Sequence, residues 1–356
     1  MNQMKHSIVE YLWVGGKGEL RSKARVLRKN IHITKLFEIP NWNFDGSSTG
    51  QADTKDSEIE LRPVRLFKCP FRRDSIYNYI VLCDTYKPDG TPALNNYRAA
   101  ALEIFNKYLD QKPWYGLEQE YFICEPVTGL PVGFELFKQQ GQYYCSVGAV
   151  NAFCREIIEE HMEACLYAGI TIAGINAEVA VSQYEFQVGP VEGIDAADQL
   201  WVSRYILERV AEKYGKVINY HPKPIKEING SGCHTNFSTK DMRSPGVFDG
   251  TTTVEGTQGI HFINDAIKKL GENHAAIMEV TGENNRERMT GQHETAHFDI
   301  FTSGVGNRNA SIRVPIETAK MQFGYLEHRC AAANVDPYRI TSIILETIMT
   351  NDFIAD

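Results

Sequence analysis

The 356-residue sequence lacks any apolar run of the roughly 18 to 20 residues that a membrane helix needs. Its first residues, MNQMKHSIVEYLW, show neither the apolar core nor the cleavage site of a secretory signal. No segment is strongly basic and the formal net charge is −8, which argues against a nucleic-acid partner. These absences lead us to expect a cytoplasmic protein with no membrane or nucleic-acid partner.

Two common cysteine and glycine motifs are also missing. The eight cysteines include no Cys-x-x-Cys pair, and a chain of this length needs no disulfide framework, so we expect free thiols. The glycine-rich segment at 15–18 is not a phosphate-binding loop, because that motif requires Ser or Thr directly after Gly-Lys. We interpret this segment as the tip of a hairpin.

The residue pattern changes near residue 95. Residues 1–95 are β-rich, and the stretch at 86–92, with its Pro, Asp and Gly, is the best linker candidate. Residues 96–356 then alternate between helical and strand-like text, which predicts an α+β chain with a small β domain ahead of a large catalytic domain. The expected helices cover 96–109, 150–168, 195–214 and 262–270, and the expected strands fall within 115–124, 170–188, 229–237 and 310–315.

Several helix ends can be predicted from capping residues. Asp195 is the expected N-cap of the third helix, and glycines are expected to close the helices at Gly169, Gly215 and Gly271. The polar stretch at 244–259 is rich in Gly and Thr and predicts a surface loop.

Acidic residues inside apolar, strand-like text are the strongest chemical signal. Glu118 and Glu120 lie two residues apart, so a strand would place both carboxylates on one face. Adjacent carboxylates repel each other unless a cation lies between them. A single Glu-x-Glu is usually a solvated strand face, but the flanking residues here are aromatic and apolar. Glu178 and Glu185 occur in similar surroundings.

A His-Glu-x-x-His sequence at 293–297 matches the zinc-protease motif. That motif works only on a helix, which brings both histidines to one face. Gly291 precedes the sequence and poor helix-forming text follows it, so a zinc site is the less favoured interpretation.

Six longer segments, taken together, resemble the glutamine synthetase family, in its shorter eukaryotic type. They occur in family order over nearly the whole chain and read WNFDGSSTGQ, GLEQEY, ACLYAG, NGSGCHTNFSTK, MTGQHETA and NRNASIR. The resemblance implies a β-grasp-like domain at 1–95, and a catalytic domain at 96–356 with a curved antiparallel sheet flanked by helices. It also implies an ATP-dependent ligase that forms glutamine from glutamate and ammonium through γ-glutamyl phosphate.

The resemblance assigns six metal ligands in two sets. Glu120, Glu178 and Glu185 match the ligands of one divalent cation, and Glu118, His234 and Glu327 match the ligands of a second. Carboxylates with one imidazole suit Mg²⁺ or Mn²⁺ better than Zn²⁺, and the family implies two to three ions per site.

The remaining positions are assigned in the same way. Asp45 matches the acid that binds ammonium from a neighbouring subunit, Glu294 matches the flap glutamate, and Arg308 lies near the transferred phosphate. The glutamate-binding positions are Asn229, Gly230, Arg288, Arg308 and Arg329. The ATP-binding positions are Glu118, Glu185, Phe186, Gln187, His234, Asn236, Ser238, Arg308, Arg313 and Tyr325.

Some positions depart from the family pattern. The Glu-Asp-Arg-Arg-Pro block is Glu-His-Arg-Cys-Ala at 327–331, and the loop at 244–259 looks like an insertion. Two alternatives on the same fold stay open, a γ-glutamyl-amine ligase that uses a polyamine and a catalytically silent structural relative. The family implies a homo-oligomer, expected to be a decamer of two five-membered rings with active sites between subunits.

Overall fold

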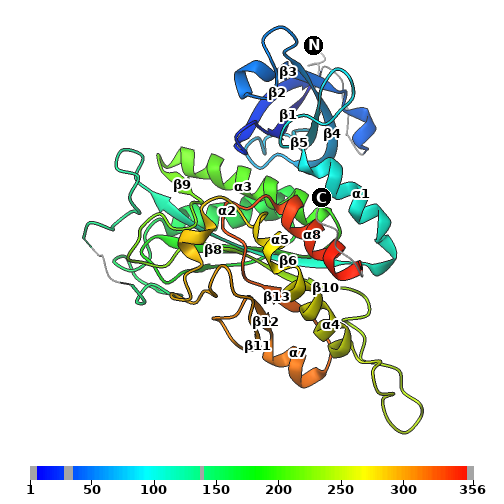
Figure 1. Ribbon diagram of the computed structural model, residues 1–356. Helices are drawn as coiled ribbons and strands as arrows, with labels where there is room; N and C mark the ends of the chain where they lie inside the picture. The colour runs from blue at the N-terminus through cyan, green and yellow to red at the C-terminus, as the bar shows by residue number, and fades with distance from the viewer. Residues whose placement is uncertain (1–5, 28–34, 137–139, 351–356) are drawn as a thin grey trace.

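The computed structural model describes residues 6–27, 35–136 and 140–350, and it is built around two β-sheets (Figure 1). A five-stranded sheet forms near the N-terminus, and an eight-stranded sheet is built from the rest of the chain. In Figure 1 a layer of helices that includes α1, α3 and α8 lies between the two sheets. In the ranges just given, no helix is both long and apolar enough to span a membrane.

The N-terminal sheet has the strand order β2-β1-β5-β4-β3, in which β1 and β5 run parallel and the other neighbours antiparallel. Its strands are β1 (Ser7–Val14), β2 (Leu20–Leu27), β3 (Trp42–Asp45), β4 (Glu58–Lys68) and β5 (Tyr79–Tyr86). The expected hairpin at 15–18 is confirmed, because it connects β1 to β2. Alternation along β1 sends Tyr11 into a small core of this sheet and Leu12 into the main core below it.

The large sheet carries the expected antiparallel pairing, with one parallel pair between β11 and β12. Its order is β11-β12-β13-β10-β6-β8-β7, and β9 pairs with the end of β6. The strands are β6 (Trp114–Cys124), β7 (Ile172–Ala177), β8 (Gln183–Glu192), β9 (Val217–Asn219), β10 (Cys233–Ser238), β11 (Ser303–Val305), β12 (Ile312–Val314) and β13 (Leu326–His328).

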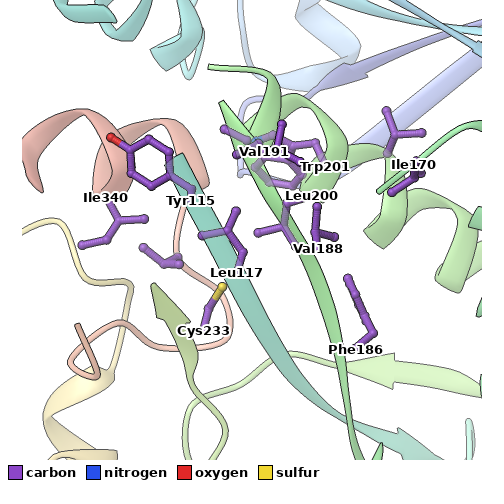
Figure 2. Packing of buried hydrophobic residues seen from close by; sticks show 14 of the residues in the cluster. Tyr115, Leu117, Ile170, Phe186, Val188, Val191, Leu200, Trp201, Cys233 and Ile340 are labelled. Carbon is purple, nitrogen blue, oxygen red and sulfur yellow. The ribbon is translucent and has the colours of Figure 1, made fainter. Parts of the chain in front are cut away.

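The helices cover one face of this sheet and bury the main core. Figure 2 shows Leu117, Phe186 and Val188 of the strands packed near Leu200 and Trp201 of α3. The helices are α1 (Tyr97–Lys107), α2 (Arg155–Ala168), α3 (Asp195–Lys213), α4 (Gly259–Glu272), α5 (His274–Met278), α6 (Asn285–Arg288), α7 (Ile316–Met321) and α8 (Pro337–Met349).

Three predicted helix boundaries are wrong. The helix expected from residue 150 begins only at Arg155, because Cys154 adopts a left-handed conformation (φ 59°). Asp195 is not an N-cap: it is the first helical residue, and its carboxylate instead pairs with Arg65 at 2.7 Å. Gly271 lies inside α4, where a Cβ would come within 2.8 Å of the Phe301 ring, so close packing explains this glycine.

The loop expected at 244–259 projects from the body of the molecule (Figure 1). It ends where α4 begins at Gly259. Its hydrogen bonds are largely internal: Val254 N donates to Val247 O at 2.7 Å, and Phe248 forms an isolated bridge with Thr253. The loop is therefore a self-contained finger on the surface.

Candidate active site

Strand register brings the six predicted metal ligands into two clusters. On β6, Glu118 and Glu120 point to the same face, and the register places Glu120 opposite Glu185 of β8. On the other side of β6, Glu118 lies opposite His234 of β10. Glu178 follows the last residue of β7 and Glu327 lies on β13, so five strands contribute to the two clusters.

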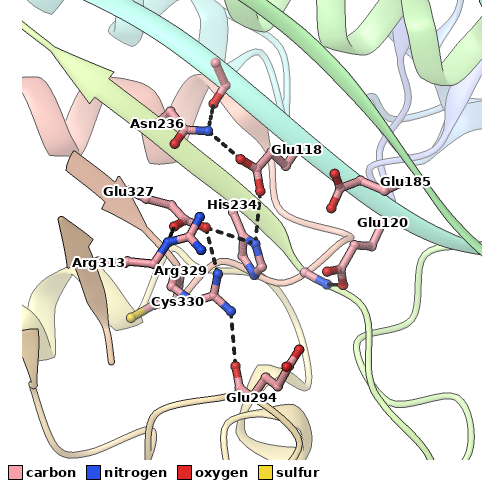
Figure 3. Close-up of polar contacts among 12 residues, drawn as sticks. Glu118, Glu120, Glu185, His234, Asn236, Glu294, Arg313, Glu327, Arg329 and Cys330 are labelled. Atoms are coloured by element: carbon pink, nitrogen blue, oxygen red, sulfur yellow. Dashed lines mark hydrogen bonds and ion pairs between the residues drawn. The ribbon is translucent and has the colours of Figure 1, made fainter. Parts of the chain in front are cut away.

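The ligand atoms within each cluster lie within 4.8 Å of one another. One cluster contains Glu118, His234 and Glu327, and the other contains Glu120, Glu178 and Glu185. In the first, His234 Nδ1 lies 3.4 Å from Glu118 Oε2 and 3.5 Å from Glu327 Oε1 (Figure 3). Each cluster can therefore offer three donor atoms to one ion.

Burial and mutual repulsion make the second cluster unfavourable as three free carboxylates. Burial raises the pKa of Glu120 to about 7, and burial together with the charge of Glu120 raises the pKa of Glu178 to about 8. The pKa of Glu185 is also raised well above its usual value, first by burial and then by the charges of Glu118, Glu120 and Glu178. A divalent cation would relieve this repulsion, and the donor set fits a hard ion.

The first cluster is prepared differently for a cation. Burial, and then the charge of Arg329, lower the pKa of His234, so the imidazole stays neutral and retains a lone pair for a metal. Arg329 Nη1 donates to Glu327 Oε1 at 2.7 Å, and Arg313 also pairs with Glu327. Asn236 Nδ2 donates a hydrogen bond of 2.7 Å to Oε1 of Glu118, the second carboxylate of this cluster. These contacts orient the carboxylates toward the imidazole.

A cavity of about 500 Å³ adjoins the first cluster at Glu118. Of the predicted ATP-binding residues it is lined by Glu118, Gln187, Asn236, Ser238 and Tyr325. Its volume suits a drug-sized or nucleotide-sized ligand. Of the six cluster residues only Glu118 lines this cavity, so the cavity meets the first cluster at that carboxylate.

Other predicted ATP-binding residues lie elsewhere. Phe186 is fully buried on the helix-covered face of the sheet, where it packs near Tyr121 and His161, so its side chain is not available to a ligand. Strand alternation explains the difference, because Glu185 and Gln187 flank it and point to the open face. Arg308 is exposed in the turn between β11 and β12 and lines no part of the cavity.

Among the cavity-lining residues that the sequence interpretation missed are Trp114, Arg243 and Phe323. Trp114 and Phe323 supply apolar surface, and the Arg243 guanidinium lies 4.0 Å from the centre of the Trp114 ring. Trp114 is the first residue of β6, the strand that carries Glu118 and Glu120, and this position was a signal that the sequence offered. Arg243 and Phe323 reach the cavity only through tertiary folding.

Four of the five predicted glutamate-binding residues lie beside the clusters, and Arg308 is the exception. Gly230 leaves no room for a side chain, since a Cβ there would lie 2.1 Å from Pro222 O. Arg288 is buried, and its Nη2 lies 3.0 Å from Arg329 O and 3.2 Å from His234 Nε2. Asn229 Oδ1 accepts a hydrogen bond of 2.7 Å from Gln140. This region surrounds the metal clusters with cationic and amide groups that suit a small carboxylate substrate.

The zinc-protease interpretation of 293–297 is excluded by the backbone. His293 (φ 55°) and Glu294 (φ 61°) form a left-handed turn, and Thr290 pairs with His297 as an isolated bridge. His293 contacts Gln140, whereas His297 caps Asp299 N, so the two imidazoles face different partners. Glu294 lies in a loop, and its own backbone carbonyl accepts a hydrogen bond of 3.3 Å from Arg329 Nη2 (Figure 3).

Asp45, a predicted catalytic residue, is not brought to the clusters by its own chain. It ends β3 at the edge of the N-terminal sheet, and the helix layer separates it from β6 and β10 (Figure 1). Its carboxylate accepts from Ser47 N, Ser47 Oγ and Ser48 Oγ at 2.6 to 3.0 Å. These bonds, that from Ser48 first, lower the pKa of Asp45 to about 2, so the exposed carboxylate is charged.

Comparison with known families agrees with this geometry. Residues 5–88 match the family model for the glutamine synthetase beta-Grasp domain, and residues 99–350 match that for the glutamine synthetase catalytic domain. The chain belongs to the glutamine synthetase family. The predicted fold class, with a β-grasp-like domain followed by a large α+β catalytic domain, is therefore confirmed.

Individual relatives are similar over nearly their whole length. A putative glutamine synthetase of Acanthamoeba polyphaga mimivirus is 54% identical over 352 residues, covering 98% of this chain and 96% of the relative. The glutamine synthetase of Saccharomyces cerevisiae is 49% identical, covering 98% of this chain and 90% of its own. That of Agaricus bisporus is 49% identical, covering 95% and 92%. These matches confirm the predicted enzyme class, a glutamate–ammonia ligase. They support neither of the two alternatives on the same fold.

Proposed function

We propose that this chain forms glutamine from ATP, glutamate and ammonium through a γ-glutamyl phosphate intermediate, with magnesium or manganese as the cation. The observation that carries the proposal is the pair of three-ligand clusters, the first of which meets a nucleotide-sized cavity at Glu118. The six ligands would hold two ions, and a third ion would bind through substrate phosphates. When bound, the ions offset charge on the triphosphate during phosphoryl transfer.

Arg313 on β12 and Arg308 in the turn before it would stabilise the phosphoryl transfer. Arg313 pairs with Glu327 of the first cluster, and from there its guanidinium would contact the transferring phosphate. Arg308, which is exposed in the turn before β12, would contact the same phosphate. Arg288 and Arg329 face the substrate region and would bind the carboxylates of glutamate. The γ-carboxylate oxygen attacks the terminal phosphorus, the bond to ADP breaks, and an acyl phosphate forms.

Asp45 and Glu294 serve the second step, in which ammonium loses a proton and its nitrogen attacks the acyl carbon. Asp45 is a charged carboxylate that attracts ammonium. Glu294, which lies on a loop, accepts the proton that ammonium loses. The Glu294 loop also shields the acyl phosphate from water. Phosphate then leaves as the carbon–nitrogen bond of the amide forms.

An intersubunit site explains why Asp45 lies far from the clusters of its own chain. We propose that β3 of one subunit covers the clusters of its neighbour in a closed ring, and that two rings of five make a decamer. The eight cysteines are all free, which supports the cytoplasm as the location of the enzyme.

Assaying glutamine and phosphate together tests this function. The purified protein with Mg²⁺, ATP, glutamate and ammonium should release both products in equal amounts. Asp45→Ala and Glu294→Ala should reduce glutamine formation by about 10²-fold or more, as expected for loss of a general acid–base group. Glu159→Ala, at an exposed site on α2, is the matched control and should not change the rate.

Two outcomes would contradict the proposal. Phosphate release that requires putrescine instead of ammonium would identify a γ-glutamyl-amine ligase. No turnover with either nucleophile, in protein that still binds ATP and Mn²⁺, would identify a structural relative.

A further inference from the structure

One glutamine side chain connects two loops of the candidate active site. Gln140 Oε1 accepts a hydrogen bond of 2.7 Å from the backbone N of Asn229, and Gln140 Nε2 donates one of 2.7 Å to Asn229 Oδ1. The same Nε2 lies 3.3 Å from His293 Nδ1. Asn229 begins the loop at 229–232 that leads into β10, and His293 directly precedes Glu294 in the loop at 290–297. Gln140 therefore contacts both the proposed glutamate-binding loop and the Glu294 loop.

The hydrogen bonds fix which way the Gln140 carboxamide points. The Asn229 backbone N–H can only donate, so the Gln140 atom that faces it must be the carbonyl oxygen. The two protons of Nε2 are then directed to Asn229 Oδ1 and to His293. Burial, and then the charge of Lys223, lower the pKa of His293, which favours the neutral ring. In the tautomer protonated at Nε2, Nδ1 of that ring accepts the hydrogen bond.

The contact with Asn229 sets the orientation of a proposed substrate-binding side chain. Asn229 is buried, and its Oδ1 is occupied by Gln140, so Nδ2 is the remaining polar group of the side chain. Nδ2 makes no hydrogen bond with another residue in the described part of the chain. It can therefore donate to a carboxylate of the substrate. Gln183 fixes the next residue of the loop, because its Nε2 donates to Gly230 O at 2.9 Å.

The contact with His293 supports a turn that is strained by itself. His293 and Glu294 both have left-handed backbone angles, φ 55° and φ 61°, which residues other than glycine rarely adopt. Such a turn persists only where surrounding contacts hold it. Arg329 Nη2 donates to Glu294 O at 3.3 Å, and Gln140 reaches His293. Loss of Gln140 would remove a support next to the acid that is proposed to accept the ammonium proton.

We propose that Gln140 is a positioning residue that couples glutamate binding to the position of the Glu294 loop. Its carboxamide leaves Asn229 Nδ2 free for the substrate and also holds His293, so that Glu294 and its loop stay closed over the acyl phosphate. The inference rests on the proposed ligase reaction. It adds to that reaction a residue that lies outside the six family segments of the sequence.

Steady-state kinetics of Gln140→Met test the proposal, because methionine is of similar length but cannot make these hydrogen bonds. The KM for glutamate should rise about tenfold, as expected for loss of hydrogen bonds that orient a binding group. The KM for ATP should stay within about twofold of the wild type. Phosphate release should exceed glutamine formation, because water reaches the acyl phosphate when the loop is loosened.

Gln142→Met is the matched control in the same segment. Gln142 is also an exposed glutamine, and its Nε2 donates to the Tyr143 hydroxyl at 2.9 Å. This variant should match the wild type in both KM values and in the ratio of phosphate to glutamine.

Hydrogen–deuterium exchange of the substrate-free protein measures the loop without any turnover. Gly291 N donates to Ala296 O, and Thr295 N donates to Gln292 O, so these two amides report opening of the loop. In Gln140→Met both should exchange at least about threefold faster than in the wild type. In Gln142→Met their exchange should be unchanged.

The proposal is overturned if Gln140→Met keeps the wild-type KM for glutamate and the equal release of both products, or if the two amides exchange at the wild-type rate. It is also overturned if both KM values rise equally and exchange is faster throughout the chain, since Gln140 would then only support the fold. Failure of the wild type to form glutamine would contradict the proposed function. The exchange experiment would still decide, in that case, whether Gln140 holds the Glu294 loop.

Discussion

At the scale of single residues, this protein places acids where their charge is unfavourable without a partner. Glu120 and Glu185 face each other across two paired strands, and Glu178 lies close to both. Repulsion between them is a cost to the metal-free fold that a bound cation removes. The same reasoning separates a binding site from a chance motif, because the histidines at 293 and 297 have separate protein partners.

Glu178→Gln should therefore differ sharply from His297→Ala in metal binding. Glu178→Gln removes one of three ligands, and we expect Mn²⁺ affinity at that cluster to fall by about 10- to 100-fold. His297→Ala should leave Mn²⁺ affinity and Zn²⁺ content unchanged. Isothermal titration with Mn²⁺ and elemental analysis measure both effects. Loss of a tightly bound Zn²⁺ in His297→Ala would contradict the exclusion of a zinc site.

Glu208 should make stability depend on pH. Its pKa in the folded state is raised to about 7, so the folded state holds this proton more tightly than the unfolded chain does. Stability contributed by Glu208 is thus present at acidic pH and is lost as pH rises from about 4.5 to about 7. Glu208→Gln lacks this loss and should be more stable than wild type at pH 8, by on the order of 2 kcal/mol.

Denaturant unfolding at several pH values measures this difference. The gain from Glu208→Gln should shrink steadily below pH 7 and vanish near pH 4. Glu159→Gln, the exposed control, should show no such trend. An equal effect of Glu208→Gln at every pH would mean that packing, and not ionisation, is responsible.

At the scale of secondary-structure elements, a buried ion pair connects the helices to the N-terminal sheet. Arg98 of α1 binds Asp198 of α3 through two bonds, of 2.8 and 3.0 Å, and contacts Asp84 of β5 at 3.5 Å. The Tyr338 hydroxyl of α8 donates to Asp198 at 2.6 Å. One carboxylate thus holds three helices together, whereas Asp84 makes a single, longer contact.

Replacing these two acids should have unequal effects. Asp198→Asn leaves Arg98 buried with a weakened partner and should destabilise the fold by about 3 to 5 kcal/mol. Asp84→Asn should cost clearly less, because burial raises the pKa of Asp84 to about 6 and the charged form is already disfavoured. The midpoints of thermal unfolding at pH 7.5 rank the variants. Equal midpoints would show that the two contacts are equivalent.

The finger at 244–259 is an element that the rest of the fold does not need. Replacing residues 247–256 with a short Gly-Ser linker removes hydrogen bonds that the finger makes mainly with itself. The change in stability should stay within about 1 kcal/mol, since loop length affects closure entropy only weakly. Thermal unfolding and the Michaelis constant for ATP provide the measurements. Arg243, which lines the cavity, directly precedes the finger and is kept in this variant. A large loss of ATP affinity would therefore show that the finger itself helps to form the ATP site.

At the scale of the whole molecule, the separation of Asp45 from the clusters makes the proposed intersubunit site testable. Asp45→Ala and Glu178→Ala should each be nearly inactive alone. In mixed oligomers, Asp45 from one variant can meet an intact cluster of the other. Random mixing in equal amounts should restore activity to about a quarter of the sites.

Coexpression of the two variants with different affinity tags, followed by tandem purification and assay, tests this complementation. Coexpression of Glu118→Ala with Glu178→Ala is the control. Both residues belong to the clusters that a single chain supplies, so these two variants cannot complement each other. No recovery in the first pair would show that Asp45 acts within its own chain or not at all.

Local sequence was sufficient for the elements and for the ligand types. Strand alternation placed Glu118 and Glu120 on one face, and glycine and proline marked the change near residue 95. The six family segments led to the ligase and its fold class, both confirmed. These properties depend on side chains within a few residues of one another, or on long specific motifs. They can therefore be predicted without knowing how the chain packs.

Tertiary structure alone decided which distant residues meet. The sequence does not show that Arg243 would stack on Trp114, or that Asp195 would pair with Arg65 instead of capping its helix. It also contains no sign of a cavity between the β1–β2 hairpin and α3, whose walls come from segments more than 300 residues apart. Such contacts depend on how sheets, helices and loops pack, and that packing is a property of the whole chain.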